Sequence, residues 1–185
     1  MTLPFNPDPQ RVWNSRKLTV RLVFFVIGAL LALSLPPQAR AVGEPAPLFK
    51  APMLEGGEFD LAAQIGKKVV ILDWWSINCS SCIQEIPKLI DISNRYQKDV
   101  LVVGMNVDSF ILKRVRRFLE TQSFKITYPT VIDAGLQIMK SYKSSILPTT
   151  VVIDKKGKIA FHHIGYKPGD ELEIEAVVKK AIAAK

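Results

Sequence analysis

The chain has 185 residues, of which 48% are apolar and 23% are charged, and its formal net charge at pH 7 is +8. That length allows one ordinary domain with an appendage, and the composition is typical of a folded chain rather than a disordered one. Two cysteines are too few for a disulfide-stapled mini-protein, and 10 glycines with 12 prolines exclude a collagen-like or linker-dominated chain.

Residues 1–41 have the three parts of an export signal. Residues 1–21 hold four basic residues and one acidic residue, residues 22–35 form an uncharged apolar run, and Ala39-Arg40-Ala41 provides a cleavage motif. We therefore expect a signal peptide that is cleaved after Ala41. The apolar run is short for a membrane-spanning helix, which needs about 20 residues, but residues 18–20 could lengthen it into an uncleaved signal anchor.

Either form of the signal predicts that residues 42–185 are exported, to the periplasm or the outer face of the cytoplasmic membrane. Membrane contact is expected only if the signal stays uncleaved. Five of the 25 basic residues and one of the 17 acidic residues lie in residues 1–41, which leaves a net charge of +4 for residues 42–185. That charge is ordinary for a folded domain, so we expect no nucleic-acid partner.

The first half of residues 42–185 is expected to alternate strands and helices. A proline-rich lead-in over 42–52 precedes a hairpin, in which Met53-Leu54 and Phe59 flank the turn 55–58. The apolar runs 69–75 and 100–107 are typical of strands that are buried on both faces. Helical spacing of apolar residues predicts helices over 82–96, which contains Pro87 and should kink there, and over 111–121.

The basic face of the predicted helix 111–121 carries four side chains, for which we expect solvent exposure, with a docking patch for an acidic partner as the alternative. The second half of the domain should hold a short strand or turn over 128–133 and a short helix over 136–142. Two strands, 149–154 and 158–163, should form a hairpin at 155–157, before a final helix over 170–184 with Asp170 as its N-cap. This order predicts an α/β domain with a mixed sheet covered by helices.

The two cysteines form the motif Cys79-Ser80-Ser81-Cys82 between a predicted buried strand and a predicted helix. A disulfide across so short a loop removes little entropy from the unfolded chain, so stabilisation does not explain it. A structural zinc site normally needs four ligands, and His162 and His163 are neighbours on a predicted strand that point to opposite faces. We therefore expect no metal. A helix N-terminus favours the thiolate, so the pKa of Cys79 should be lowered, and Cys82 is placed to resolve a mixed disulfide.

Residues 73–82, Asp-Trp-Trp-Ser-Ile-Asn-Cys-Ser-Ser-Cys, resemble the active-site segment of the thioredoxin superfamily. Pro87 matches the proline of the thioredoxin helix, and Ile146-Leu147-Pro148-Thr149-Thr150 matches the cis-proline loop. The lead-in, an insertion around 107–133 and Glu85 make the chain more similar to the exported TlpA/ResA-like branch. The resemblance covers residues 44–184. It implies a thioredoxin-like mixed β-sheet flanked by helices, with an N-terminal β-hairpin extension and a central insertion.

The resemblance also implies roles for individual residues. Cys79 and Cys82 would be the redox pair and the only redox group, without a further cofactor. Glu85 and Asp73 correspond to acidic residues of the TlpA/ResA-like branch and of thioredoxin itself, and each is a candidate proton acceptor for Cys82. The pKa of Asp73 should be raised, because that residue lies at the end of a buried strand, and Glu85 is favoured as the acceptor.

The substrate-binding residues implied by the resemblance are Leu147, Pro148, Asn78 and Trp75. The Leu147–Pro148 peptide bond is expected to be cis. Asn78 replaces a tryptophan of most relatives, and Ser80-Ser81 replaces their proline-containing dipeptide, so the reduction potential and the choice of partner can differ from theirs.

The expected function is that of an exported thiol-disulfide oxidoreductase that reduces or exchanges disulfides in envelope proteins. The resemblance implies a membrane electron donor of the DsbD/CcdA type and, for some relatives, apocytochrome c as substrate. A peroxiredoxin-type thiol peroxidase is an alternative, but Leu72 occupies the proline position of its P-x-x-x-[ST]-x-x-C motif. A second alternative is a non-catalytic binding module or copper chaperone on the same fold.

Overall fold

The computed structural model of the protein describes residues 42–184, and the predicted export signal at residues 1–41 lies outside them. The described residues form a five-stranded sheet in the order β5-β4-β3-β6-β7 and a separate hairpin, β1-β2. Strands β3, β4 and β5 are parallel, whereas β6 and β7 are antiparallel to their neighbours. The strands are β1 Lys50–Pro52, β2 Glu58–Asp60, β3 Val69–Trp75, β4 Val100–Asn106, β5 Thr130–Ile132, β6 Thr149–Ile153 and β7 Ile159–Ile164.

Strand β3 lies at the centre of the sheet, and all seven of its residues are buried. This is the reason for its nearly unbroken apolar sequence, because a strand covered on both faces has no solvent side on which to place polar residues. Alternate residues of β3 enter different clusters of the core. Leu72 and Trp74 pack toward α4 and the hairpin, while Val69 and Ile71 pack toward α2 and α5.

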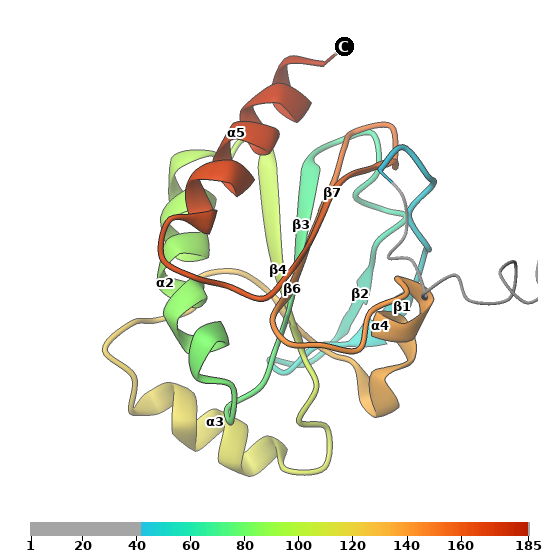
Figure 1. The fold of residues 1–185 in the computed structure, drawn as a ribbon. Coiled ribbons are helices and arrows are strands. Elements are labelled where there is room, and N and C mark those ends of the chain that lie inside the picture. Colours follow the sequence, from blue (N-terminus) through green and yellow to red (C-terminus); the bar gives the residue numbers. More distant parts are fainter. Residues whose placement is uncertain (1–41, 185) are drawn as a thin grey trace, which may run out of the picture. The chain divides into compact units, whose positions relative to one another are not determined.

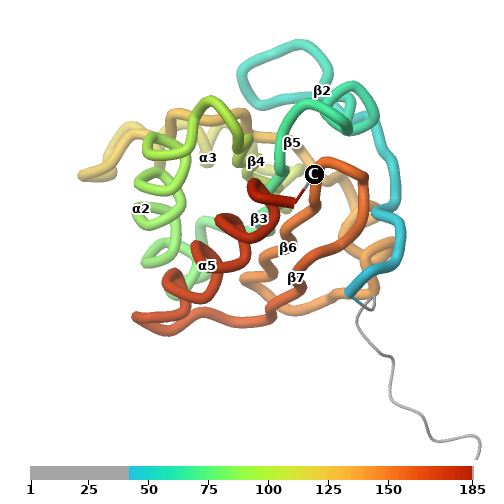
Figure 2. The backbone as a smooth tube through the Cα atoms, turned by 90° about the horizontal axis from the view of Figure 1, so that it is seen from above, coloured from blue at the N-terminus to red at the C-terminus, as the bar shows by residue number. Residues whose placement is uncertain are grey.

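The sheet is therefore a middle layer between two covers, as Figures 1 and 2 show. Helices α2 and α5 pack side by side on one face, and α4 with the β1-β2 hairpin lies on the other face. Helix α3 lies at the end of the sheet where α2 begins (Figure 1). The helices are α2 Ser80–Arg95, α3 Leu112–Glu120, α4 Gln137–Ser141, which follows the 3-10 turn Ala134–Leu136, and α5 Asp170–Ala183.

Two predicted details of the elements were wrong. Strand β1 lies at Lys50–Pro52, before the predicted Met53-Leu54. The Met53 backbone instead belongs to the hairpin turn, where Met53 N donates to Gly57 O at 3.0 Å, and it also forms a bridge to Val131 of β5. The N-cap of α5 is Gly169 with a φ of 109°, while Asp170 is the first helical residue. The Asp170 carboxylate instead accepts a hydrogen bond from Lys167 N at 3.0 Å. Pro87 lies within α2, which continues to Arg95.

The buried carboxylate of Asp133 connects α4 to the central strand β3 by hydrogen bonds. Asp133 Oδ2 accepts hydrogen bonds from Trp74 Nε1 at 2.9 Å and from Met139 N at 2.8 Å, and its Oδ1 accepts one from Ile138 N at 3.0 Å. These backbone N–H groups belong to the first turn of α4, where no intrahelical acceptor exists. Among residues 42–184, no helix is both long and apolar enough to cross a membrane.

Candidate active site

The cysteine pair lies where β3 leads into α2, as predicted. Cys79 is the N-cap of α2, with an extended backbone, and its Sγ accepts a hydrogen bond from Cys82 N at 3.2 Å. The two cysteines form a disulfide with a Cα–Cα distance of 5.3 Å. Cys79 is partly exposed, whereas Cys82 is fully buried one turn further along the helix. The two sulfur atoms therefore differ in their access to solvent.

An aspartate that we did not predict holds the turn before Cys79. Asp108 Oδ1 accepts a hydrogen bond from Ser76 Oγ at 2.8 Å, and its Oδ2 accepts hydrogen bonds from Ile77 N at 2.9 Å and Asn106 Nδ2 at 3.0 Å. Asp108 lies just after β4, so it connects the ends of two adjacent parallel strands. Polar residues at the carboxyl ends of parallel strands often belong to a functional site. The position of Asp108 after a predicted buried strand was therefore the only feature of the sequence that pointed to a role in the site.

The loop from Ile146 to Pro148 lies beside the disulfide. The Leu147–Pro148 peptide bond is cis, which confirms that prediction. Leu147 packs into the same cluster as Cys79 and the fully buried Cys82. Ile146 is exposed, and so is Ile164, which is the register partner of Thr149 at the end of β7. The partly exposed sulfur is therefore next to an apolar loop surface.

The four predicted substrate-binding residues do not all reach the surface. Asn78 is exposed and Leu147 is half-buried, so both are accessible from outside, while Pro148 is buried. Trp75 is fully buried, and its predicted contact with a substrate is wrong for this structure. The reason is its place on β3, because its ring packs under α2 with Cys82 and Ile86.

Both predicted carboxylates are fully buried on the α2 side of the sheet. Burial raises the pKa of Glu85 to about 7, against a lowering effect of the Thr150 hydrogen bond and with smaller raising effects of Asp170 and Glu171. Thr150 Oγ1 donates that bond to Glu85 Oε1 at 2.6 Å. Burial, and then the charge of Glu85, raise the pKa of Asp73 well above its usual range. The direction predicted for the Asp73 pKa is confirmed.

The two histidines point to opposite sides of β7. His163 Nε2 lies 3.1 Å from Asp170 Oδ2 at the start of α5, and its ring stacks on Phe161. His162 pairs in register with Val151, which belongs to the other face. In the described part of the chain, no group of three His, Cys, Asp or Glu side chains is arranged to hold a metal ion.

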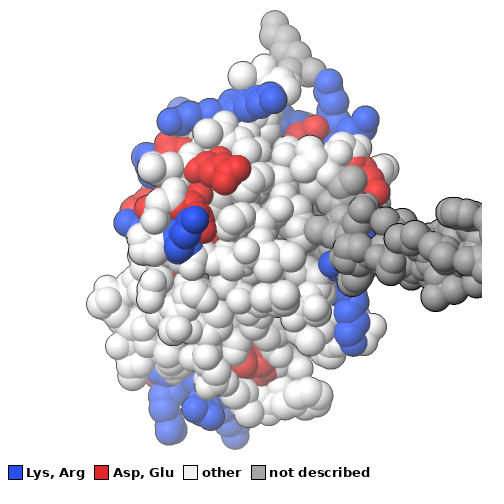
Figure 3. Space-filling model, viewed as in Figure 1, with Lys and Arg blue, Asp and Glu red and all other residues white. Residues whose placement is uncertain are grey.

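The four basic side chains of α3 are exposed, as predicted: Lys113, Arg114, Arg116 and Arg117. Arg116 also donates a hydrogen bond from Nη2 to Leu54 O at 2.8 Å and so connects α3 to the loop that follows β1. Figure 3 shows Lys and Arg side chains gathered at the lower edge of the molecule, where Figure 1 places α3. The apolar side of α3, through Leu112, packs into the cluster that contains Cys79.

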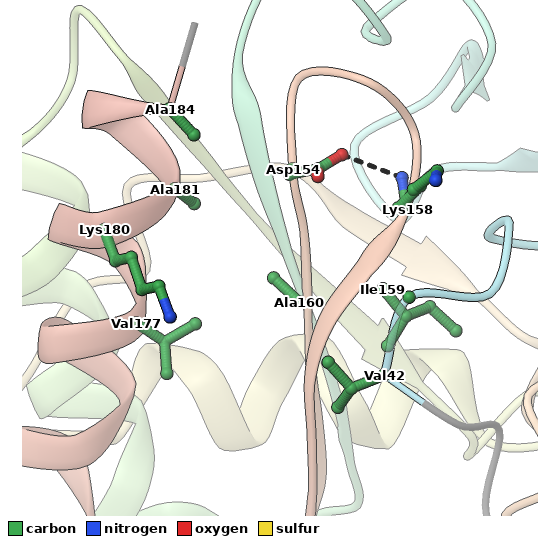
Figure 4. A pocket seen from close by; sticks show the side chains of 10 residues that line it. Val42, Asp154, Lys158, Ile159, Ala160, Val177, Lys180, Ala181 and Ala184 are labelled. Atoms are coloured by element: carbon green, nitrogen blue, oxygen red, sulfur yellow. Dashed lines mark hydrogen bonds between the residues drawn. The ribbon is translucent and has the colours of Figure 1, made fainter.

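A pocket of about 290 Å³ lies far from the cysteines (Figure 4). Its walls come from the first residues of β7 and the last turns of α5, with Lys180 directed toward the opening between them. The disulfide instead lies near the opposite ends of these elements, because Ile164 at the end of β7 neighbours the Pro148 loop. The pocket therefore takes no part in the thiol chemistry.

Comparison with known proteins agrees with this geometry. The AhpC/TSA family model matches residues 42–162. The chain is 39% identical over 122 residues to the thiol-disulfide oxidoreductase ResA of Geobacillus thermodenitrificans, which covers 65% of this chain and 68% of that protein. It is 34% identical over 133 residues to the thioredoxin-like protein YneN of Bacillus subtilis, which covers 71% of this chain and 76% of that protein.

Solved structures show the same fold. A thiol:disulfide interchange protein DsbE from Chlorobium tepidum superimposes with a TM-score of 0.71 and 28% identity, covering 77% of this chain and 99% of that chain. A mycobacterial DsbF, at 19% identity, superimposes with a TM-score of 0.62 and covers 80% of this chain and 99% of that chain. The predicted thioredoxin-like architecture is thereby confirmed.

Proposed function

This chain belongs to the AhpC/TSA family and is a TlpA/ResA-like thiol-disulfide oxidoreductase of the thioredoxin superfamily, and on that premise we propose that it reduces or exchanges disulfides of envelope proteins. Apocytochrome c is the proposed substrate, and a membrane protein of the DsbD/CcdA type is the proposed electron donor. The signal-like segment at residues 1–41 supports export, and an oxidising compartment would require such a donor.

One observation carries the proposed mechanism, namely the unequal environment of the two cysteines. Cys79 is partly exposed at the helix N-terminus beside the Pro148 loop, and Cys82 is fully buried on the same helix as Glu85. The backbone N–H of Cys82, which donates to Cys79 Sγ, and the positive end of α2 both favour a thiolate at Cys79. Cys79 is therefore the proposed nucleophile and Cys82 the proposed resolving thiol.

The proposed reaction has two exchange steps. The Cys79 thiolate attacks one sulfur of the substrate disulfide, so that a mixed disulfide forms and the other substrate sulfur leaves as a thiolate. Cys82 then loses its proton to Glu85 and attacks Cys79 Sγ, which forms the Cys79–Cys82 disulfide and releases the second substrate thiolate. Two electrons pass to the substrate, and the membrane donor would return them. Because burial raises the pKa of Glu85 to about 7, that carboxyl can accept a proton at neutral pH.

Alkylation of the reduced protein at about pH 6 tests these roles, because only a stabilised thiolate reacts there. We expect Cys79 to be labelled first, and Cys82→Ser to accumulate a mixed disulfide with a model substrate. Cys79→Ser, the matched control, should neither react at that pH nor form the mixed disulfide. Preferential labelling of Cys82 would reverse the two roles.

The direction of electron flow is tested by the reduction potential of the pair, equilibrated with glutathione. We expect a value closer to the roughly −270 mV of thioredoxin than to the roughly −120 mV of DsbA. A value near the oxidising end would replace the proposed reductase with an oxidant or an isomerase.

A further inference from the structure

Behind the cysteine pair, three adjacent strands present neighbouring residues toward α2. Asp73 of β3 is the register partner of both Thr150 of β6 and Gly104 of β4. Register partners on adjacent strands point to the same face of a sheet. The hydrogen bond from Thr150 to Glu85 of α2 identifies that face. Asp73 therefore lies between Thr150, which holds Glu85, and Gly104, which has no side chain.

Two rings occupy the space that Gly104 leaves open. A Cβ atom on Gly104 would lie 3.3 Å from Cε2 of Tyr128 and 3.0 Å from Nε1 of Trp75. Tyr128 is only 6% exposed and Trp75 is fully buried. Both rings thus lie against the backbone next to Asp73, and each carries a hydrogen-bond donor.

The polar atoms of this group are unpaired but complementary. Among residues 42–184, no residue forms a hydrogen bond with Asp73 Oδ1 or Oδ2, with Glu85 Oε2, with Tyr128 Oη or with Trp75 Nε1. Three of these atoms are carboxyl oxygens and two belong to donor groups. Buried polar atoms are almost always hydrogen-bonded, and a buried water typically makes about three hydrogen bonds to such groups. Donors and acceptors on one face therefore satisfy one another most simply through a shared water.

We propose that Tyr128 is a positioning residue for the proton transfer from Cys82: its hydroxyl, together with the Trp75 indole N–H, donates through a buried water to the Asp73–Glu85 carboxyl pair and favours ionisation of the pair. This inference rests on the proposed role of Glu85 as proton acceptor. Burial, and then the charges of Asp73 and Glu85, raise the pKa of Tyr128. The phenol therefore keeps its proton at neutral pH and stays a donor.

Other charged groups also act on the pair, and they lie on its opposite side. Asp170 and Glu171 of α5 raise the pKa of Glu85. His163 of β7 lies 3.1 Å from Asp170, and Tyr166 donates to Glu171 at 2.9 Å. Tyr128 is thus the phenol on the β4 side of Asp73, whereas the α5 groups approach from the β7 side. A change at position 128 leaves the α5 groups in place.

The test is the pH–rate profile of disulfide reduction by the full chain and by Tyr128→Phe, which keeps the ring and removes the donor. Loss of a hydrogen bond to a carboxylate should raise the apparent pKa of the resolving step by about one pH unit. A fluorotyrosine at position 128 is a stronger donor of nearly the same shape, so it should shift the profile in the opposite direction. An infrared titration of the buried carboxyl groups should follow both shifts without relying on turnover.

Tyr142→Phe is the matched control. Its hydroxyl, on the other face of the sheet, donates to Pro47 O at 2.9 Å. Its loss should lower the unfolding midpoint and leave the profile in place. The proposal is overturned if Tyr128→Phe leaves both the profile and the carboxyl titration unchanged, or if it shifts them to lower pH. If Tyr128→Phe raises the unfolding midpoint and leaves the carboxyl titration unchanged, the Tyr128 hydroxyl is a buried group without a hydrogen-bond partner, and the proposal is overturned.

A Glu85→Gln background separates this inference from the mechanism on which it rests. If Glu85 accepts the proton, Glu85→Gln should abolish the part of the pH–rate profile that reports the ionisation of Glu85. In that background, Tyr128→Phe should cause no further shift of the profile. If Glu85→Gln leaves the profile unchanged, the proposed acceptor is wrong, and the infrared titration of the Tyr128 variants alone decides whether the phenol contacts the carboxyl pair.

Discussion

At the scale of single residues, the site combines two buried acids with a disulfide that is partly exposed. Burying a carboxylate is costly, and the pKa of Glu85 near 7 reflects that cost. Glu85 lies three positions after the buried Cys82 and therefore on the same buried face of α2, where the Thr150 hydroxyl provides a hydrogen-bond partner for it. The chain therefore retains a group that is poorly suited to stability and well suited to accepting a proton near neutral pH.

Gly104 is the residue whose replacement most directly tests the packing behind this site. Gly104→Ala would place a methyl group 3.0 Å from Trp75 Nε1 and 3.3 Å from the Tyr128 ring, which is tighter than most Cβ contacts, so both buried rings would have to shift. We expect the variant to lose roughly 1–3 kcal/mol of unfolding free energy, as overpacked cores do. Urea denaturation would measure the loss, and tryptophan fluorescence would report displacement of the Trp75 ring. Unchanged stability would mean that both rings move aside freely.

At the scale of elements, the turn between β3 and α2 depends on contacts outside both elements. Residues 76–78 precede the cysteine pair, and Asp108, which follows β4, accepts hydrogen bonds from the Ser76 hydroxyl and the Ile77 backbone. Parallel strands bring their carboxyl ends to the same edge of a sheet, so the connection after β4 reaches the start of α2. The position of Cys79 is thus determined by two strands together.

Asp108→Ala should loosen this turn. The variant loses three hydrogen bonds to a carboxylate, and hydrogen bonds to charged groups contribute about 1.5–3 kcal/mol each at most. We expect a loss of about 2–4 kcal/mol in unfolding free energy and slower reaction of Cys79 with a model disulfide. Asp91→Ala, at an exposed position of α2, is the control and should change neither quantity. Equal effects of both substitutions would contradict the role of Asp108.

At the scale of the whole molecule, the two buried acids connect folding to pH. A carboxyl whose pKa is higher in the folded protein than in the unfolded chain holds its proton more tightly when folded. Its favourable contribution is complete below the ordinary pKa and is lost as the pH rises through the folded-state value. For Glu85 that window extends from about 4.5 to about 7, and Asp73 adds to the loss in the same direction.

The unfolding free energy of the oxidised protein should therefore fall as the pH rises across that window. The slope for one carboxyl is about 1.4 kcal/mol per pH unit, which gives a total on the order of 3 kcal/mol for Glu85. Urea denaturation at a series of pH values would measure it. Glu85→Gln should remove that part of the slope, while Glu120→Gln, at an exposed position of α3, should keep it. A stability that rises with pH in wild type would contradict the burial of charge at these two residues.

Much of this protein was predictable because local sequence carried enough information. The apolar runs of β3 and β4, the helical spacing of α2 and the Cys79–Cys82 motif each reflect a period or a spacing within a few residues of chain. The cis-proline loop was predicted through its resemblance to a family. The prediction failed at β1, where contacts with a distant segment meet the hairpin, since the backbone of Met53 forms a bridge to Val131 of β5.

Only the tertiary structure decided which polar residues belong to the site. Tyr128 and Gly104 have no local signal, and Asp108 has only its position after a buried strand, because the significance of all three comes from the way β4 and its flanking loops lie beside β3. Trp75 was expected to bind substrate, but its strand is covered by α2, which buries the ring completely. The sequence alone determined the redox chemistry, since two cysteines at a helix start suffice to define it. The proton environment depended on packing, because burial and neighbouring charges set a pKa and both arise only when distant segments meet.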